Sequence, residues 1–110
     1  MTNADIKEDY CDFYLGSESP GGYAWAFPKG PQEGNIGMGV LASKLAGKHS
    51  IDYLNAFVER HFPDAQPVEL HLGGVPVSKP VRKTVDDGLM LVGDAAHHVD
   101  PITGLSLIHI

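Results

Sequence analysis

Residues 22–28, Gly-Tyr-Ala-Trp-Ala-Phe-Pro, show the strongest alternation of large and small side chains in the chain. In a strand, this alternation places three rings on one face: Tyr23, Trp25 and Phe27. The opposite face carries alanines and is nearly bare. A turn-rich stretch follows, and residues 35–42 are expected to form a second strand whose glycines allow a close approach. The pattern predicts a β-hairpin over 22–42.

A helix is predicted over residues 51–62. Four apolar side chains recur there at the spacing of one helical face: Ile51, Leu54, Phe57 and Val58. Ser50 is expected to cap the start of this helix, and Pro63 is expected to end it. This is the strongest helix signal in the sequence.

The remaining expected strands are short and lie at 10–15, 68–72 and 89–92, with an extended, proline-containing segment at 75–80. The run at 89–92 is wholly apolar, which is typical of a buried strand. Pro101 is placed as in the first turn of a second helix. The predicted fold class is α+β, with antiparallel strands and one main helix followed by a strand that returns to a second region.

Composition narrows the function classes. The chain has 110 residues, 43% of them apolar and 20% charged, as in a folded domain or part of one. Its formal charge is -6, from 8 basic and 14 acidic residues without a basic cluster, which argues against nucleic-acid binding. Cys11 is the only cysteine, which excludes an internal disulfide and fits a reducing compartment. We expect Cys11 to be a small core residue.

The first eight residues have neither the basic start nor the apolar run of a signal peptide, and no apolar segment has the length needed to span a bilayer. The expected location is therefore the cytoplasm, and any membrane contact is expected to be peripheral.

Asp94 and the histidines that follow it are candidates for chemistry. An ionised carboxylate just past a strand accepts hydrogen bonds, which suits sugar or ribitol hydroxyls. On spacing alone, however, an Asp that caps turn N–H groups is the more usual explanation, just as the aromatic row is more usually a core face. His97 and His98 could suggest a metal or an acid-base role, but adjacent side chains seldom converge on one ion. We expect a solvated pair there and no metal site.

Residues 93–104, Gly-Asp-Ala-Ala-His-His-Val-Asp-Pro-Ile-Thr-Gly, resemble the second flavin motif of FAD-dependent reductases and hydroxylases built like p-hydroxybenzoate hydroxylase. Together with Asp-Gly-Leu-Met-Leu-Val at 87–92, the stretch is similar to the geranylgeranyl reductase family. An independent match, Pro-Gly-Gly-Tyr-Ala-Trp-Ala-Phe-Pro at 20–28, is similar to that family's Tyr-x-Trp-x-Phe-Pro substrate motif. The resemblance runs from about residue 10 to residue 104 and covers a middle portion of a family member.

The resemblance implies a set of FAD-binding residues: Gly93, Asp94, Ala95, Ala96, Pro101, Thr103 and Gly104. Within this set, Asp94 would contact the ribitol, residues 101–104 would lie against the isoalloxazine ring, and Gly104 is a candidate to bring backbone N–H groups to that ring. The implied wall of an isoprenoid tunnel consists of Tyr23, Trp25, Phe27 and Pro28. Residues 1–86 would then be part of the substrate region, and 87–104 the returning strand and flavin motif of a p-hydroxybenzoate hydroxylase-like FAD fold.

The implied function is that of an FAD-dependent oxidoreductase that reduces geranylgeranyl double bonds in lipid biosynthesis, with an unidentified electron donor and no side chain assigned as catalyst. Two alternatives remain open: an FAD monooxygenase of the aromatic hydroxylase type, and a lipid-binding or interaction domain without redox chemistry. The chain contains no Gly-x-Gly-x-x-Gly turn for the FAD pyrophosphate, so it is expected to bind FAD poorly alone and to be inactive. Residues 105–110 depart from the family pattern and are expected to be a non-native or truncated end.

Overall fold

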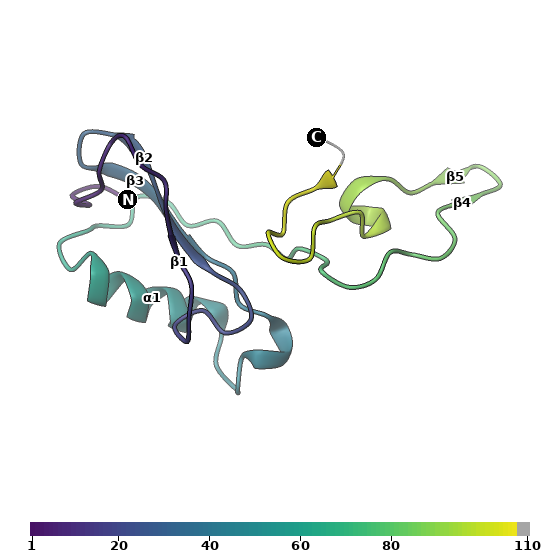
Figure 1. Ribbon diagram of the computed structural model, residues 1–110, viewed down its shortest axis with the longest axis horizontal. Helices are drawn as coiled ribbons and strands as arrows, with labels where there is room; N and C mark the ends of the chain where they lie inside the picture. The colour runs from purple at the N-terminus through teal and green to yellow at the C-terminus, as the bar shows by residue number, and fades with distance from the viewer. Residues whose placement is uncertain (108–110) are drawn as a thin grey trace. The chain divides into compact units, whose positions relative to one another are not determined.

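A computed structural model of the chain describes residues 1–107. It divides into two compact units, Met1–Leu70 and His71–Ile110, of which the second is described as far as residue 107. The first unit contains a three-stranded sheet and a helix, and the second a short hairpin and turns (Figure 1). The α+β class with antiparallel strands and one main helix is confirmed. Residues 108–110 of the expected non-native end lie outside the described residues.

The sheet of the first unit has the order β1-β2-β3, and both pairs of strands are antiparallel. Its strands are β1 (Asp12–Tyr14), β2 (Ala24–Gly30) and β3 (Glu33–Met38). The predicted hairpin is therefore confirmed, although its second strand begins and ends earlier than 35–42. The register shifts between Pro28 and Gly30. A proline has no N–H to donate to the neighbouring strand, so it is tolerated at such an irregularity.

Helix α1 (Ser50–His61) lies one residue from its predicted bounds. Its N-cap is His49 rather than Ser50, and the His49 N–H donates to Asp52 Oδ2 at 2.7 Å. This contact is half of a capping box, and it satisfies a backbone group that the helix leaves unpaired. At the other end the helix stops before Pro63, as predicted. A short 3-10 helix, η1 (Ala42–Lys44), precedes α1.

The core of the first unit lies between α1 and one face of the sheet, as Figure 1 shows. Its buried members are Ala4, Ala24, Ala26, Phe57 and Phe62. The alanines of β2 thus form the covered face of that strand. Small side chains allow a helix to approach the backbone closely, and the large Phe57 ring, 2% exposed, fills the space that they leave.

The second unit contains β4 (Val85–Asp86), β5 (Leu89–Met90) and the 3-10 helix η2 (Gly93–Ala96). The two strands pair only with each other among the described residues. The predicted buried strand at 89–92 is therefore wrong in length and in burial: Met90 is 69% exposed. A two-residue partner cannot cover an apolar run.

Residues 68–72 form no strand, although their side chains alternate. A strand needs a partner for its backbone groups, and no described strand pairs with this segment. Within residues 1–107, none of the helices has the length and apolar character required to cross a membrane.

Candidate functional site

Two groups of candidate residues lie in different units. The first is an aromatic face of the sheet in residues 1–70, and the second is the stretch 93–104 in the other unit.

The ring of Tyr23, just before β2, forms a row with those of Trp25 and Phe27 on β2, with successive centroids 5.9 and 6.2 Å apart. Phe13 on β1 joins them, because its ring centroid lies 5.6 Å from that of Tyr23 and 5.3 Å from that of Phe27. We call these four residues the aromatic face. Phe13 is 57% exposed, and the other three rings are only partly covered.

The aromatic face is not the core of the first unit. The core lies on the opposite side of β2, where Ala24 and Ala26 are fully buried against α1. The explanation that would be usual for such a row, a sheet's core face, is therefore wrong here. A cluster of large rings on a partly exposed surface is typical of a site that binds an apolar partner.

The indole ring of Trp25 packs closely on the neighbouring strand, β3. Gly37 is its cross-strand partner, and a Cβ atom built at Gly37 would overlap the indole ring. The indole Nε1 donates to Asn35 Oδ1 at 2.7 Å. The close approach expected at a glycine of the second strand is confirmed, and the approaching group is the indole of Trp25.

Phe13 is a member of the face that was missed from the sequence. Side chains alternate along β1, and the next ring, Tyr14, points to the core, where it packs on Phe57 with centroids 4.9 Å apart. Burial, and secondarily the charge of Asp12, raises the pKa of Tyr14. The signal was the aromatic pair in a three-residue strand, because such a pair must divide between the two faces. By the same alternation, Pro28 belongs to the alanine side of β2.

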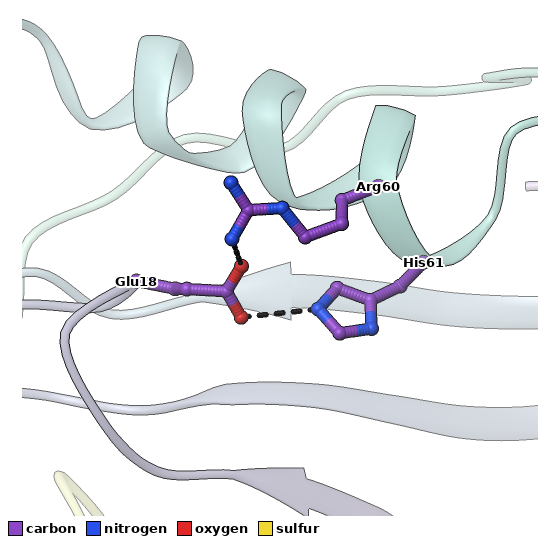
Figure 2. A network of polar contacts seen from close by, with 3 residues as sticks. All are labelled: Glu18, Arg60 and His61. Atoms are coloured by element: carbon purple, nitrogen blue, oxygen red, sulfur yellow. Dashed lines mark hydrogen bonds and ion pairs between the residues drawn. The ribbon is translucent and has the colours of Figure 1, made fainter.

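Glu18 anchors the loop that joins β1 to β2, as Figure 2 shows. Its carboxylate accepts hydrogen bonds from the Arg60 guanidinium and from His61 Nε2, the latter at 3.0 Å. Both donors belong to the last turn of α1. These contacts, chiefly the hydrogen bond from His61, hold the pKa of Glu18 below its usual range. The anchored loop connects β1, which carries Phe13, to Tyr23, the residue just before β2.

In the second unit, η2 presents Asp94 to solvent while Gly93 and Ala96 are buried. The Asp94 carboxylate accepts no hydrogen bond within residues 1–107, so the usual role of capping a turn is not what it does here. An exposed, acceptor-only group is available for ligand hydroxyls. Ala95 is also exposed on this turn.

Residues 100–104 form one closed turn. Asp100 Oδ1 accepts the Ile102 N–H at 2.9 Å, and the Asp100 carbonyl accepts the Gly104 N–H at 2.8 Å. Backbone hydrogen bonds, above all the one from Ile102, lower the pKa of Asp100. Gly104 has a φ of 69°, which is usual for glycine after a helical turn.

Residues 101–103 are a turn, so the second helix expected at Pro101 is absent here. The Gly104 N–H also points into the turn, and reaching a flavin would require breaking its bond.

His97 is held by other residues, contrary to the expected solvated pair. Its Nδ1 lies 2.8 Å from Ser78 Oγ and 3.3 Å from the Lys79 carbonyl oxygen. No group of three or more metal-binding side chains comes together in the described part of the chain. Cys11 is exposed, so its expected place in the core is also wrong.

Known proteins resemble this chain over nearly its whole length. A family model of the geranylgeranyl reductase catalytic domain matches residues 1–75, which include the aromatic face. A digeranylgeranylglycerophospholipid reductase of Methanosarcina mazei is 53% identical, over 99% of this chain and 28% of that protein. The enzyme of the same name from Methanocella arvoryzae is also 53% identical, with the same two coverages.

A solved structure also resembles this chain. A geranylgeranyl bacteriochlorophyll reductase-like protein from Thermoplasma acidophilum matches with a TM-score of 0.85 and 44% identity, over 96% of this chain and 27% of that one. The chain thus spans about 28% of the length of the two curated relatives.

Proposed function

The chain belongs to the geranylgeranyl reductase family, and from that premise we propose that it supplies part of an FAD-dependent oxidoreductase that saturates double bonds of an isoprenoid lipid. The observation that carries the proposal is the aromatic face, which lies outside the core. The names of the relatives, which refer to a digeranylgeranyl glycerophospholipid, support the substrate class.

The aromatic face suits a polyprenyl chain on physical grounds. Such a chain offers no polar groups, so its affinity must come from buried apolar area, at about 25 cal/mol per Å2. Rigid rings supply that area at a low cost in conformational entropy. In the proposal, Phe13, Tyr23, Trp25 and Phe27 bind the isoprenoid and exclude water from it, whereas Pro28, on the alanine side of β2, is left out of the binding surface.

The proposed flavin-binding residues are those of the 93–104 stretch. An exposed Asp94 whose carboxylate has no partner within residues 1–107 fits a hydroxyl-bearing ribitol. Gly93, Ala95 and Ala96 would form the path beside it, and Pro101, Thr103 and Gly104 would lie toward the ring. When bound and reduced, FAD would supply the hydride for the alkene, with a proton to complete the addition, and the protein would position the alkene and keep water away. The electron donor that recharges the flavin would be a separate partner.

Peripheral contact with a membrane is part of the same proposal, because the proposed substrate is a lipid. The proposed compartment is the cytoplasm, because a free, exposed thiol such as that of Cys11 fits a reducing environment.

The test is a chimera in which this chain replaces the matching segment of the Methanosarcina mazei reductase. We expect the chimera, reduced anaerobically with dithionite, to saturate a geranylgeranyl glycerophospholipid, with a mass gain of two hydrogens per double bond. Trp25→Ala should weaken lipid binding, and Asp94→Ala should weaken flavin binding. Hydroxylation of the lipid when oxygen is admitted to the reduced chimera would instead indicate the monooxygenase alternative. A flavin-loaded chimera that binds the lipid and leaves it unchanged would indicate a binding domain.

A further inference from the structure

The backbone of His97 is unusual. Its φ is 57°, in the left-handed region that a residue with a side chain seldom adopts. In this conformation the His97 N–H donates to the Asp94 carbonyl at 3.0 Å, and the His98 N–H donates to the Gly93 carbonyl at 2.9 Å. The left-handed turn therefore closes the end of η2, which carries Asp94. A conformation that is costly by itself persists where its surroundings hold it.

The side chain of His97 provides such a hold. Its Nδ1 lies within hydrogen-bond distance of the Ser78 hydroxyl, at 2.8 Å, and more weakly of the Lys79 carbonyl, at 3.3 Å. Close by, the Val81 N–H donates to the Ala96 carbonyl at 3.1 Å. The segment 78–81 thus contacts the end of η2 through two interactions of the His97 ring and one backbone hydrogen bond, across 15 to 19 residues of sequence.

The contact between Ser78 and His97 is not a nucleophile with its base. A catalytic pair of this kind needs a third group that orients the imidazole from its other nitrogen. No residue in the described range hydrogen-bonds to Nε2 of His97, and Nδ1 is shared with a backbone carbonyl. In either neutral tautomer the ring remains held: Nδ1 accepts from the Ser78 hydroxyl, or it donates to the Lys79 carbonyl.

We propose that Ser78 and His97 form a positioning pair, which fixes the left-handed turn after η2 and so holds the Asp94 carboxylate where it can meet the hydroxyls of a bound cofactor. Neither residue touches the cofactor in this proposal. The identity of the cofactor rests on the proposed function, whereas the effect of the pair on the turn does not.

Four variants distinguish the effect of the contact between Ser78 and His97 from the effect of the left-handed backbone at His97. Ser78→Ala removes one hydroxyl and leaves His97 intact. His97→Gly removes the ring and the strain together, and His97→Ala removes the ring but keeps the strain. His97→Asn keeps a polar side chain on a residue that tolerates left-handed φ. Ser43→Ala, at an exposed serine of η1, is the matched control.

The first measurement needs no cofactor. Amide hydrogen exchange of the 110-residue chain, followed by NMR, reports the opening of the turn through the His97 and His98 amides. We expect Ser78→Ala to speed exchange at these amides about fivefold, the effect usual for loss of one hydrogen bond. His97→Ala should speed it more than His97→Asn. Ser78→Ala added to His97→Gly should change nothing further, because the partner is already gone.

The second measurement is FAD affinity in the Methanosarcina mazei chimera, from quenching of flavin fluorescence. Ser78→Ala should weaken binding about fivefold, and Ser43→Ala should not. Unchanged exchange and unchanged affinity in Ser78→Ala would overturn the positioning pair. A different result is faster exchange in Ser78→Ala together with an unmutated chimera that binds no FAD. It would overturn the proposed function and would leave the effect of the pair on the turn standing.

Discussion

The indole of Trp25 covers Gly37 on the neighbouring strand, so closely that the position has no room for a Cβ atom. The hydrogen bond from Nε1 to Asn35 fixes the ring in that seat. A glycine inside a strand usually weakens it, and a large neighbour that needs the space is a common reason for its presence. The orientation of Trp25, the central ring of the aromatic face, therefore depends on having glycine at position 37.

We predict that Gly37→Ala displaces the indole. The added methyl group must push either the ring or strand β3, which should lower the free energy of unfolding by about 1–3 kcal/mol. Trp25 is the only tryptophan, so its fluorescence emission reports the displacement directly. Gly30→Ala is the matched control, because nothing lies within 4 Å of a Cβ built there. If Gly37→Ala had the emission and stability of the parent chain, the close packing of Trp25 on Gly37 would be contradicted.

Phe57 should dominate the stability of the first unit. It is 2% exposed and packs from α1 against the sheet. Phe57→Ala should therefore lower the free energy of unfolding by about 3–5 kcal/mol, measured by urea unfolding followed by Trp25 fluorescence. Because that loss can exceed the available stability, Phe57→Leu serves as a milder variant, with an expected cost of about 1 kcal/mol. Leu15→Ala, at an 82% exposed side chain, should change stability by less than about 0.5 kcal/mol. Equal effects of Phe57→Leu and Leu15→Ala would refute this core.

Glu18 should make stability depend on pH. Its pKa is lowered in the folded state, so its contribution is present above the ordinary pKa of the carboxyl and is lost as the pH falls through the folded value. We predict that Glu18→Gln lowers the urea midpoint at pH 7 and that the difference from the parent chain shrinks from about pH 5 downward. Added salt should reduce the difference too, since the contacts are near the surface. Glu59→Gln, an exposed position on α1, is the control. A difference that is constant from pH 7 to pH 3 would exclude the ionic contribution.

Local signals in the sequence predicted the elements well. The helix was placed within one residue, because apolar spacing and Pro63 act over a few neighbouring positions. The hairpin was found for the same reason. Alternation also divided β2 correctly into an aromatic side and an alanine side.

What alternation cannot give is which side is covered. That depends on where α1 docks, and Phe57 meets Ala24 and Ala26 only in the folded unit. The strands expected at 68–72 and 89–92 failed in the same way, because a strand requires a partner that can be distant in sequence. The contact between Ser78 and His97 spans 19 residues, and no periodicity signals it.

Phe13 provides the sharpest test of the aromatic face, because it was identified from the structure rather than from the motif. Its ring contacts both ends of the row on β2, and more than half of it is exposed. If an isoprenoid chain lies on this face, it buries that exposed ring area, and Phe13→Ala should weaken lipid binding by about 1 kcal/mol, or roughly fivefold. Tyr10→Ala, at a comparably exposed aromatic residue that contacts none of the four rings, should leave affinity unchanged. Titration of the chimera with a geranylgeranyl lipid, followed by isothermal calorimetry, measures both. Equal affinity of the Phe13→Ala and Tyr10→Ala variants would remove Phe13 from the binding surface.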